Sequence, residues 1–139
     1  MCYTIKQTAN ERLLEGRFRA RVKYPPQLEQ IEKSSGFAFP LVPIITNKET
    51  ESIQLFHWGL IPHWAKDKEI SKNTLNARIE TIEKKPSFRS YTTNRCLVLI
   101  DGFYEYQWQD PKGKVKKLYL MTMPDGEPFA LGGLYSVWT

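Results

Sequence analysis

The chain has 139 residues, of which 41% are hydrophobic and 25% charged, and a formal net charge of +5. This composition is typical of a globular protein. No apolar run approaches the roughly 20 residues of a membrane span, and the N-terminus lacks the basic start and apolar stretch of a signal peptide. We therefore expect a cytoplasmic protein without a membrane partner. The two cysteines, Cys2 and Cys96, have no Cys or His at metal-ligand spacing, so we expect neither a metal site nor a disulfide, and Cys96 is predicted to be a core thiol.

The N-terminal half alternates between helical and extended patterns. Apolar residues at helical spacing predict an amphipathic helix over residues 8–22 that begins at Thr8 or Asn10 and ends at two prolines. The prolines in "FAFPLVPIIT" (residues 37–46) favour an edge strand or a loop-like strand. The stretch "SIQLFHWGLIP" (52–62) predicts a strand, and "HWAKDKEISKNTLNAR" (63–78) predicts an irregular, functional loop.

The C-terminal half is predicted to be mostly strand. A short helix over residues 79–86 is followed by extended stretches at 95–108, 115–123 and 128–138 with tight turns between them. This order predicts an α+β fold whose mainly antiparallel sheet curls into a barrel-like core with short flanking helices. We expect residues 1–139 to form a single domain. Because the apolar stretch "FALGGLYSVWT" runs to the last residue, we expect that domain to be truncated at its C-terminus.

Cys2 directly follows the initiator methionine. Removing Met1 would leave a 1,2-aminothiol, in which an α-amine with a pKa of about 7.7–8.0 lies beside a thiol with a pKa of about 8.5. Such a pair is suited to capturing an aldehyde: the amine forms an imine and the thiol then closes a thiazolidine ring. On position alone, an ordinary packed or exposed cysteine is an open alternative.

Glu105 lies in "DGFYEY" (101–106), where strand alternation places it on the same face as Phe103. If that face points inward, the burial of a carboxylate is costly unless the group has a partner or a task. A partly buried Glu has a raised pKa and can accept and donate protons near neutral pH. An outward-facing Glu on a solvated face is the alternative that the pattern leaves open.

Two further stretches carry groups that suit DNA. In "NARIET" (76–81), Asn76 offers donors and an acceptor, Arg78 can grip a phosphate, and Glu80 can orient Arg78; a loop turn with an ordinary ion pair is the alternative. In "FHWGLIPHW" (56–64), exposed tryptophans could stack on bases, although Trp58 could instead be core with only Trp64 exposed.

Together, "MC", "FHWGLIPHW", "NARIET" and "DGFYEY" resemble, in this order and over nearly the whole chain, the SRAP family of SOS response-associated peptidases. The family includes proteins that crosslink to abasic sites in single-stranded DNA. The resemblance implies an abasic-site sensor that acts in the DNA damage or SOS response, forms a covalent thiazolidine link through Cys2, and has peptidase-type autoprocessing and possible lyase activity. It also implies a nucleoid-associated, monomeric protein that needs no cofactor.

The resemblance assigns roles to individual residues. Cys2, Asn76 and Glu105 would be catalytic, with Glu105 as acid/base. The DNA-binding residues would be Arg78, Trp58, Trp64 and Lys6, and Glu80 would orient Arg78.

The chain departs from the family pattern at two places. Tyr3 and Thr4 stand where Gly and Arg are common, so Lys6 is expected to replace a phosphate contact. A C-terminal "HxRMP"-like His motif is also absent, which leaves the completeness of the activity open.

Two other functions remain open from the sequence. In an N-terminal-nucleophile amidohydrolase, the Cys2 thiolate would attack an amide and its own amine would be the base. In a non-catalytic module for single-stranded DNA, Cys2 would be inert and the basic residues would supply the affinity. The net charge favours an anionic partner without identifying it.

Overall fold

The computed structural model describes residues 1–139 as two β-sheets with one α-helix and four short 3-10 helices. The strands are β1 (Thr4–Gln7), β2 (Arg21–Val22), β3 (Ile31–Ser35), β4 (Leu41–Thr46), β5 (Glu49–His57), β6 (Arg95–Ile100), β7 (Gly102–Trp108), β8 (Lys116–Met121) and β9 (Phe129–Leu134). The helices are α1 (Glu11–Phe18), η1 (Pro25–Gln27), η2 (Gly36–Ala38), η3 (Glu69–Asn73) and η4 (Arg89–Tyr91).

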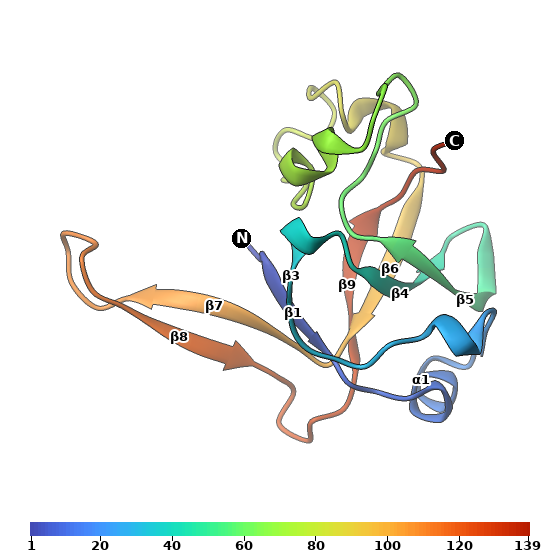
Figure 1. Cartoon of the computed structure of the whole chain (residues 1–139), viewed down its shortest axis with the longest axis horizontal. Coiled ribbons are helices and arrows are strands. Elements are labelled where there is room, and N and C mark those ends of the chain that lie inside the picture. Colours follow the sequence, from blue (N-terminus) through green and yellow to red (C-terminus); the bar gives the residue numbers. More distant parts are fainter.

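The sheets have the strand orders β3-β1-β7-β8 and β2-β5-β4-β6-β9, and every pair is antiparallel except β2–β5. The predicted α+β class with mainly antiparallel pairing is therefore confirmed. The predicted closure toward a barrel is wrong. Each sheet ends in two edge strands that pair on one side only, and β7 and β8 project from the body as a two-stranded arm (Figure 1).

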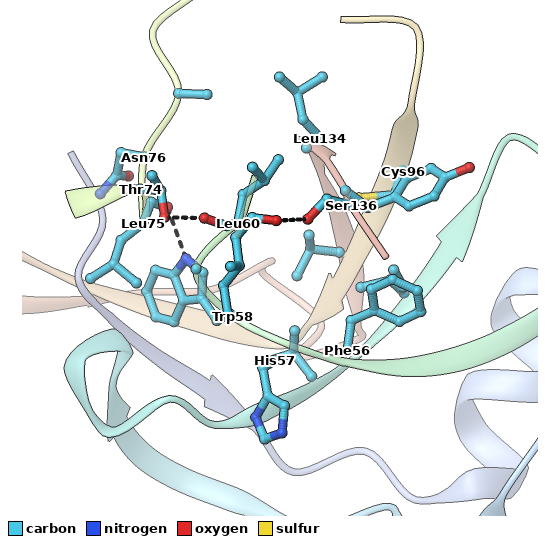
Figure 2. A pocket seen from close by; sticks show the side chains of 18 of the residues that line it. Phe56, His57, Trp58, Leu60, Thr74, Leu75, Asn76, Cys96, Leu134 and Ser136 are labelled. Carbon is cyan, nitrogen blue, oxygen red and sulfur yellow. Dashed lines mark hydrogen bonds between the residues drawn. The ribbon is translucent and has the colours of Figure 1, made fainter. Parts of the chain in front are cut away.

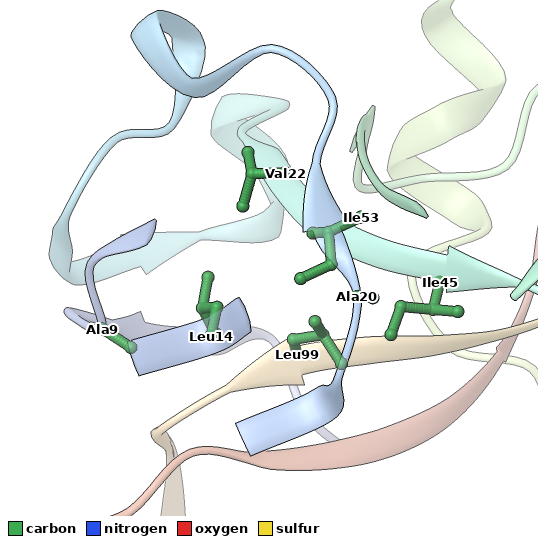
Figure 3. Packing of buried hydrophobic residues seen from close by; sticks show 7 residues of the cluster. All are labelled: Ala9, Leu14, Ala20, Val22, Ile45, Ile53 and Leu99. Atoms are coloured by element: carbon green, nitrogen blue, oxygen red, sulfur yellow. The ribbon is translucent and has the colours of Figure 1, made fainter. Parts of the chain in front are cut away.

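The five-stranded sheet is apolar on both faces because its central strands alternate between two clusters. Ile45 and Leu99 face helix α1 and form one cluster with Ile53, which Figure 3 shows together with Leu14. The neighbouring residues on β4 and β6 point to the opposite face. There they form a second cluster with Ile5 of β1 and with Tyr135, which follows β9; its members are Ile5, Val42, Ile44, Cys96, Ile100 and Tyr135. Cys96 is thus a core thiol, as predicted.

Asp101 lies where the chain passes from one sheet to the other, between β6 and β7. Its side chain is only 6% exposed, and its carboxylate accepts hydrogen bonds from the backbone N–H and the hydroxyl of Thr8 and pairs with the Lys6 ammonium at 3.5 Å. A buried carboxylate is tolerated only with such partners. Asp101 therefore fixes the start of β7, and with it the position of Glu105.

The helix is shorter than predicted. Asn10 is its N-cap and accepts a hydrogen bond from the Leu13 backbone N–H, but the helix ends at Phe18, because Arg19 adopts a left-handed conformation with φ of 54°. Val22, which fits the helical spacing, belongs to β2 and packs beside Ile53. A left-handed residue after the last turn ends a helix before any proline is reached.

Two other local predictions are wrong. The proline-containing strand β4 lies in the centre of its sheet, between β5 and β6. This is possible because β4 pairs with β6 only from Ile44 onward, so Pro43 precedes the doubly paired part. Residues 79–86 form successive turns instead of a helix, with backbone hydrogen bonds such as Ile82 N–H to Arg78 C=O.

No helix in the structure has the length and hydropathy needed to cross a membrane.

Candidate functional site: an N-terminal cysteine between an amide and a carboxylate

Cys2 is held in place by Asn76, which lies far away in the sequence. The backbone N–H of Cys2 donates to Asn76 Oδ1 at 3.1 Å, and Asn76 Nδ2 donates to the Cys2 carbonyl at 2.8 Å. One side-chain amide thus satisfies both backbone groups of one residue, which fixes the direction of the N-terminus. The half-buried Cys2 side chain packs against the second core cluster.

Glu105 faces the same N-terminus from β7. Its carboxylate Oε1 lies 3.6 Å from the Met1 ammonium, and its side chain is 36% exposed. The pKa of the Cys2 thiol is raised, first by burial and further by the negative charge of Glu105. The predicted catalytic residues Cys2, Asn76 and Glu105 are therefore brought together, although they come from three separate parts of the chain.

The loop that carries Asn76 is tied to the end of β5. The indole Nε1 of Trp58 donates to the Leu75 carbonyl at 2.8 Å, and the Thr74 hydroxyl donates to the Leu60 carbonyl at 2.7 Å. Figure 2 shows the indole pointing toward Leu75, next to Asn76. Trp58 is half-buried, so its main contacts are with the protein itself. Trp64, by contrast, is 51% exposed. The two tryptophans therefore follow the alternative that the sequence left open, in which Trp58 packs against the protein and only Trp64 is exposed.

Gly59 allows the end of β5 and the segment around Ser71 to approach each other. Its φ is +117°, and a Cβ at this position would lie 2.7 Å from the Ser71 carbonyl oxygen. Only glycine adopts this conformation without strain and leaves the space that Ser71 occupies. The roles of Leu75 and Thr74 could not be predicted from the sequence. Their contacts involve the backbone carbonyls of Leu75 and Leu60, and a backbone carbonyl leaves no residue-type signal.

A hollow of about 560 Å³ has Cys2 and Asn76 among its lining residues. Its walls are mostly apolar and come largely from the face of the five-stranded sheet opposite α1, together with Trp58 and Leu75. Cys2 and Asn76 are thus polar groups in the wall of a mostly apolar hollow.

The remaining predicted DNA-binding residues are not all near Cys2. Arg78 and Glu80 are exposed and form an ion pair with Nε and Oε2 at 3.8 Å, two residues beyond Asn76. Lys6 does not line the hollow at Cys2; its ammonium is engaged with Asp101 and the Thr8 hydroxyl. No three His, Cys, Asp or Glu side chains gather so that they could hold a metal ion.

Fold and site together define a class: open α+β sheets that present an N-terminal cysteine to a clamping amide and a carboxylate. The family model described as SOS response associated peptidase (SRAP) matches residues 1–139. The chain belongs to this family.

Curated relatives with similar sequences are named abasic site processing proteins. The abasic site processing protein YoqW of Bacillus subtilis (strain 168) is 38% identical over 99 residues, which cover 70% of this chain and 43% of that protein. The abasic site processing protein HMCES of Rattus norvegicus is 49% identical over 55 residues, or 36% of this chain and 16% of that protein.

A crystal structure of a Bacteroides thetaiotaomicron protein superimposes with a TM-score of 0.82 and 31% identity, over 99% of this chain and 61% of that one. A second crystal structure, of a Bordetella bronchiseptica protein, has a TM-score of 0.74 at 21% identity and supports the fold alone. The chain spans less than half the length of YoqW and under two thirds of the Bacteroides protein.

Proposed function

We propose that this protein recognises abasic sites in single-stranded DNA and links to them covalently through Cys2 after Met1 is removed. The observation that carries the proposal is the fixed N-terminus: Asn76 holds the Cys2 backbone on both sides, and Glu105 lies 3.6 Å from the terminal amine of Met1, the residue directly before Cys2. The names of the relatives, which process abasic sites, support the same substrate. The peptidase activity in the family name would then be the removal of Met1.

The chemistry needs only groups that this site offers. Glu105 takes a proton from the Cys2 ammonium, and the free amine attacks C1′ of the ring-opened abasic sugar. The resulting carbinolamine receives that proton on its hydroxyl and loses water to give an iminium ion, which returns its nitrogen proton to the Glu105 carboxylate and becomes an imine. The thiol adds across the C=N bond, sulfur to carbon and proton to nitrogen, and closes the thiazolidine. One aldehyde and one aminothiol give one thiazolidine and one water, so no oxidant or cofactor is required.

Asn76 and Glu105 have different roles in this scheme. Asn76 contacts the Cys2 backbone and so directs the amine toward the sugar, whereas Glu105 moves protons. Because burial and the charge of Glu105 raise the pKa of the Cys2 thiol, this thiol is protonated at neutral pH and is able to supply the proton of the last step.

DNA contacts would come from exposed residues around the site. Arg78 has a guanidinium that can grip a phosphate once it leaves Glu80, because an exposed ion pair is worth little. Trp64 has an exposed ring that can stack on a base. Trp58 acts instead by holding the Asn76 loop, and Lys6 is committed to Asp101.

An amidohydrolase that uses Cys2 is less well supported. Its substrate would have to enter beside Cys2, where the hollow is lined mostly by apolar side chains and offers few partners for a polar amide. A non-catalytic DNA-binding module does not explain why one amide and one carboxylate converge on the N-terminus.

The direct test is denaturing gel electrophoresis of the Met1-processed protein with a single-stranded oligonucleotide that bears one abasic site. We expect a shifted band whose mass equals protein plus DNA minus one water. Cys2→Ala should abolish it, and Glu105→Gln should slow its formation by about a hundred-fold, the low end of general acid–base contributions.

Cys96→Ala is the matched control, because it removes the other thiol from the core and should leave the band intact. If mass spectrometry confirms a free Cys2 amine and the wild-type protein still forms no band, the proposal is wrong. A glutaminase assay then tests the amidohydrolase, and DNA binding that survives in Cys2→Ala would favour the non-catalytic module.

A further inference from the structure

The β7–β8 arm has two different faces, which its pairing register defines. Glu105 pairs with Tyr119, and Gln107 pairs with Lys117. Because side chains alternate along a strand and directly paired residues share a face, these four residues lie on one face of the arm. We call it the site face, since Glu105 lies on it and contacts the N-terminus.

The opposite face, which we call the outer face, has similar chemistry but does not carry Glu105. Its outer part carries Tyr106, Trp108, Lys116 and Leu118. The Lys116 ammonium lies 4.2 Å from the centre of the Tyr106 ring. The arm therefore offers an exposed aromatic–lysine pair on each side, and only one of these pairs adjoins the candidate site.

On the site face, Tyr119 is the direct cross-strand neighbour of Glu105. Its ring is 39% exposed, and the Lys117 ammonium lies 5.3 Å from the ring centre. Lys117 is two residues along β8 from Tyr119, which places its Cα about 7 Å further out on the arm. An aromatic ring and a cation thus follow one another outward from the carboxylate that faces Cys2.

This sequence of groups fits single-stranded DNA. Bases stack on aromatic rings without regard to sequence, and lysines neutralise the phosphates between them. Lys112 and Lys114 at the tip of the arm extend the positive charge beyond Lys117. A strand held with its lesion at Cys2 would meet these groups in turn.

We propose that the site face of the arm binds the DNA that flanks the lesion: Tyr119 stacks on a base next to the abasic site, and Lys117 binds a neighbouring phosphate. The inference rests on the proposed function, because it takes the lesion to lie at Cys2. Tyr119 and Lys117 are positioning residues and take no part in the covalent steps.

The test is single-turnover crosslinking of the Met1-processed protein, measured against protein concentration. Tyr119→Ala should raise the half-saturating concentration at least about five-fold, the lower end of what one stacked base contributes, and leave the rate at saturation unchanged. Tyr106→Ala, the same change on the outer face, should alter neither value. Lys117→Ala should flatten the salt dependence of the half-saturating concentration more than Lys116→Ala does.

A second measurement separates stacking from a structural effect. Unreactive spacers without a base replace the nucleotide on the 5′ or the 3′ side of the abasic site. With one of these two oligonucleotides, the half-saturating concentration of the wild-type protein should rise by about the factor that Tyr119→Ala causes with the ordinary oligonucleotide. The half-saturating concentration of Tyr119→Ala itself should rise no further. A merely structural role for Tyr119 would instead weaken its binding equally to all oligonucleotides.

The outcomes are distinct. If the wild-type protein crosslinks but Tyr119→Ala leaves the half-saturating concentration unchanged, or raises it no more than Tyr106→Ala does, the arm inference is overturned and the proposed function stands. If Tyr119→Ala changes the oligomeric state in light scattering and leaves the half-saturating concentration unchanged, the face binds protein and the inference is also overturned. If the wild-type protein forms no crosslink, both the inference and the proposed function fail.

Discussion

At the scale of single residues, the two thiols of this chain differ in what surrounds them. Burial raises the pKa of Cys96 to about 11, and no charged group contributes. The pKa of Cys2 is raised by burial and also by the charge of Glu105. Burial is the larger cause for Cys2, and the part of the pKa shift that comes from Glu105 can be removed by one substitution.

This difference gives opposite predictions for two reactions of Glu105→Gln. Removing the negative charge lowers the pKa of the Cys2 thiol toward its ordinary value, so more thiolate is present at pH 8 and alkylation by iodoacetamide should be faster than in wild type. Crosslinking to an abasic site should be slower, because the proton carrier is lost. Alkylation is measured by mass spectrometry of the native protein.

The Cys96 thiol is the internal control for that experiment. With a pKa of about 11 and a buried side chain, it should stay unmodified at pH 8 in both proteins. If Glu105→Gln alkylates Cys2 no faster than wild type, the charge of Glu105 does not act on this thiol.

At the scale of elements, the site depends on two chain segments held side by side. Trp58 and Thr74 supply the hydrogen bonds between the end of β5 and the loop before Asn76. Gly59 supplies the space, since Ser71 lies where a Cβ would be. An irregular loop thus becomes a fixed support for the Asn76 side chain.

Gly59→Ala should lower the free energy of unfolding by at least about 2 kcal/mol, because it adds a strained left-handed residue to a steric clash. Gly16→Ala is the matched control: Gly16 lies inside α1 with nothing within 4 Å of a new Cβ. Alanine is the better helix former, so this change should raise stability by about 0.5–1 kcal/mol. Urea denaturation measures the free energy of unfolding of both variants, and equal changes in the two would contradict the role given to Gly59.

At the scale of the whole molecule, the site lies between two open sheets that are joined through Asp101. The N-terminal cysteine packs on one sheet, whereas Glu105 is on a strand of the other. The buried carboxylate of Asp101 ties β1 to the first residue of β7 through Thr8 and Lys6. The distance between Cys2 and Glu105 therefore depends on this joint.

Asp101→Ala should lower the free energy of unfolding by about 3 kcal/mol, because it leaves the Thr8 N–H and the Lys6 ammonium without their buried partner. Asp125→Ala, which removes an exposed carboxylate that accepts a bond only from the Glu127 N–H, should cost about 0.5 kcal/mol or less. Thermal unfolding followed by circular dichroism distinguishes the two. Similar losses in both variants would show that Asp101 does not join the sheets.

The sequence by itself determined the fold class, the strands from β5 onward and the family, but not the strands β1, β2 and β3. Alternation predicted strands at the places where β5 to β9 lie, and the four motifs indicated the family that the chain belongs to. These signals are local: side-chain type and spacing set which face of an element is apolar and which groups can react.

Only the tertiary structure decided where the elements stop and which reactive groups meet. Helix α1 ends at a left-handed Arg19, and β4 is central because its partner strand pairs only beyond Pro43, features that depend on backbone conformation and register. Asn76 reaches Cys2 because Trp58 holds a backbone carbonyl of its loop, and no residue type reports that contact. Pairing across long sequence separations is set by the packing of the whole chain. For this reason the contacts that join Cys2, Asn76 and Glu105 became visible only once the fold was known.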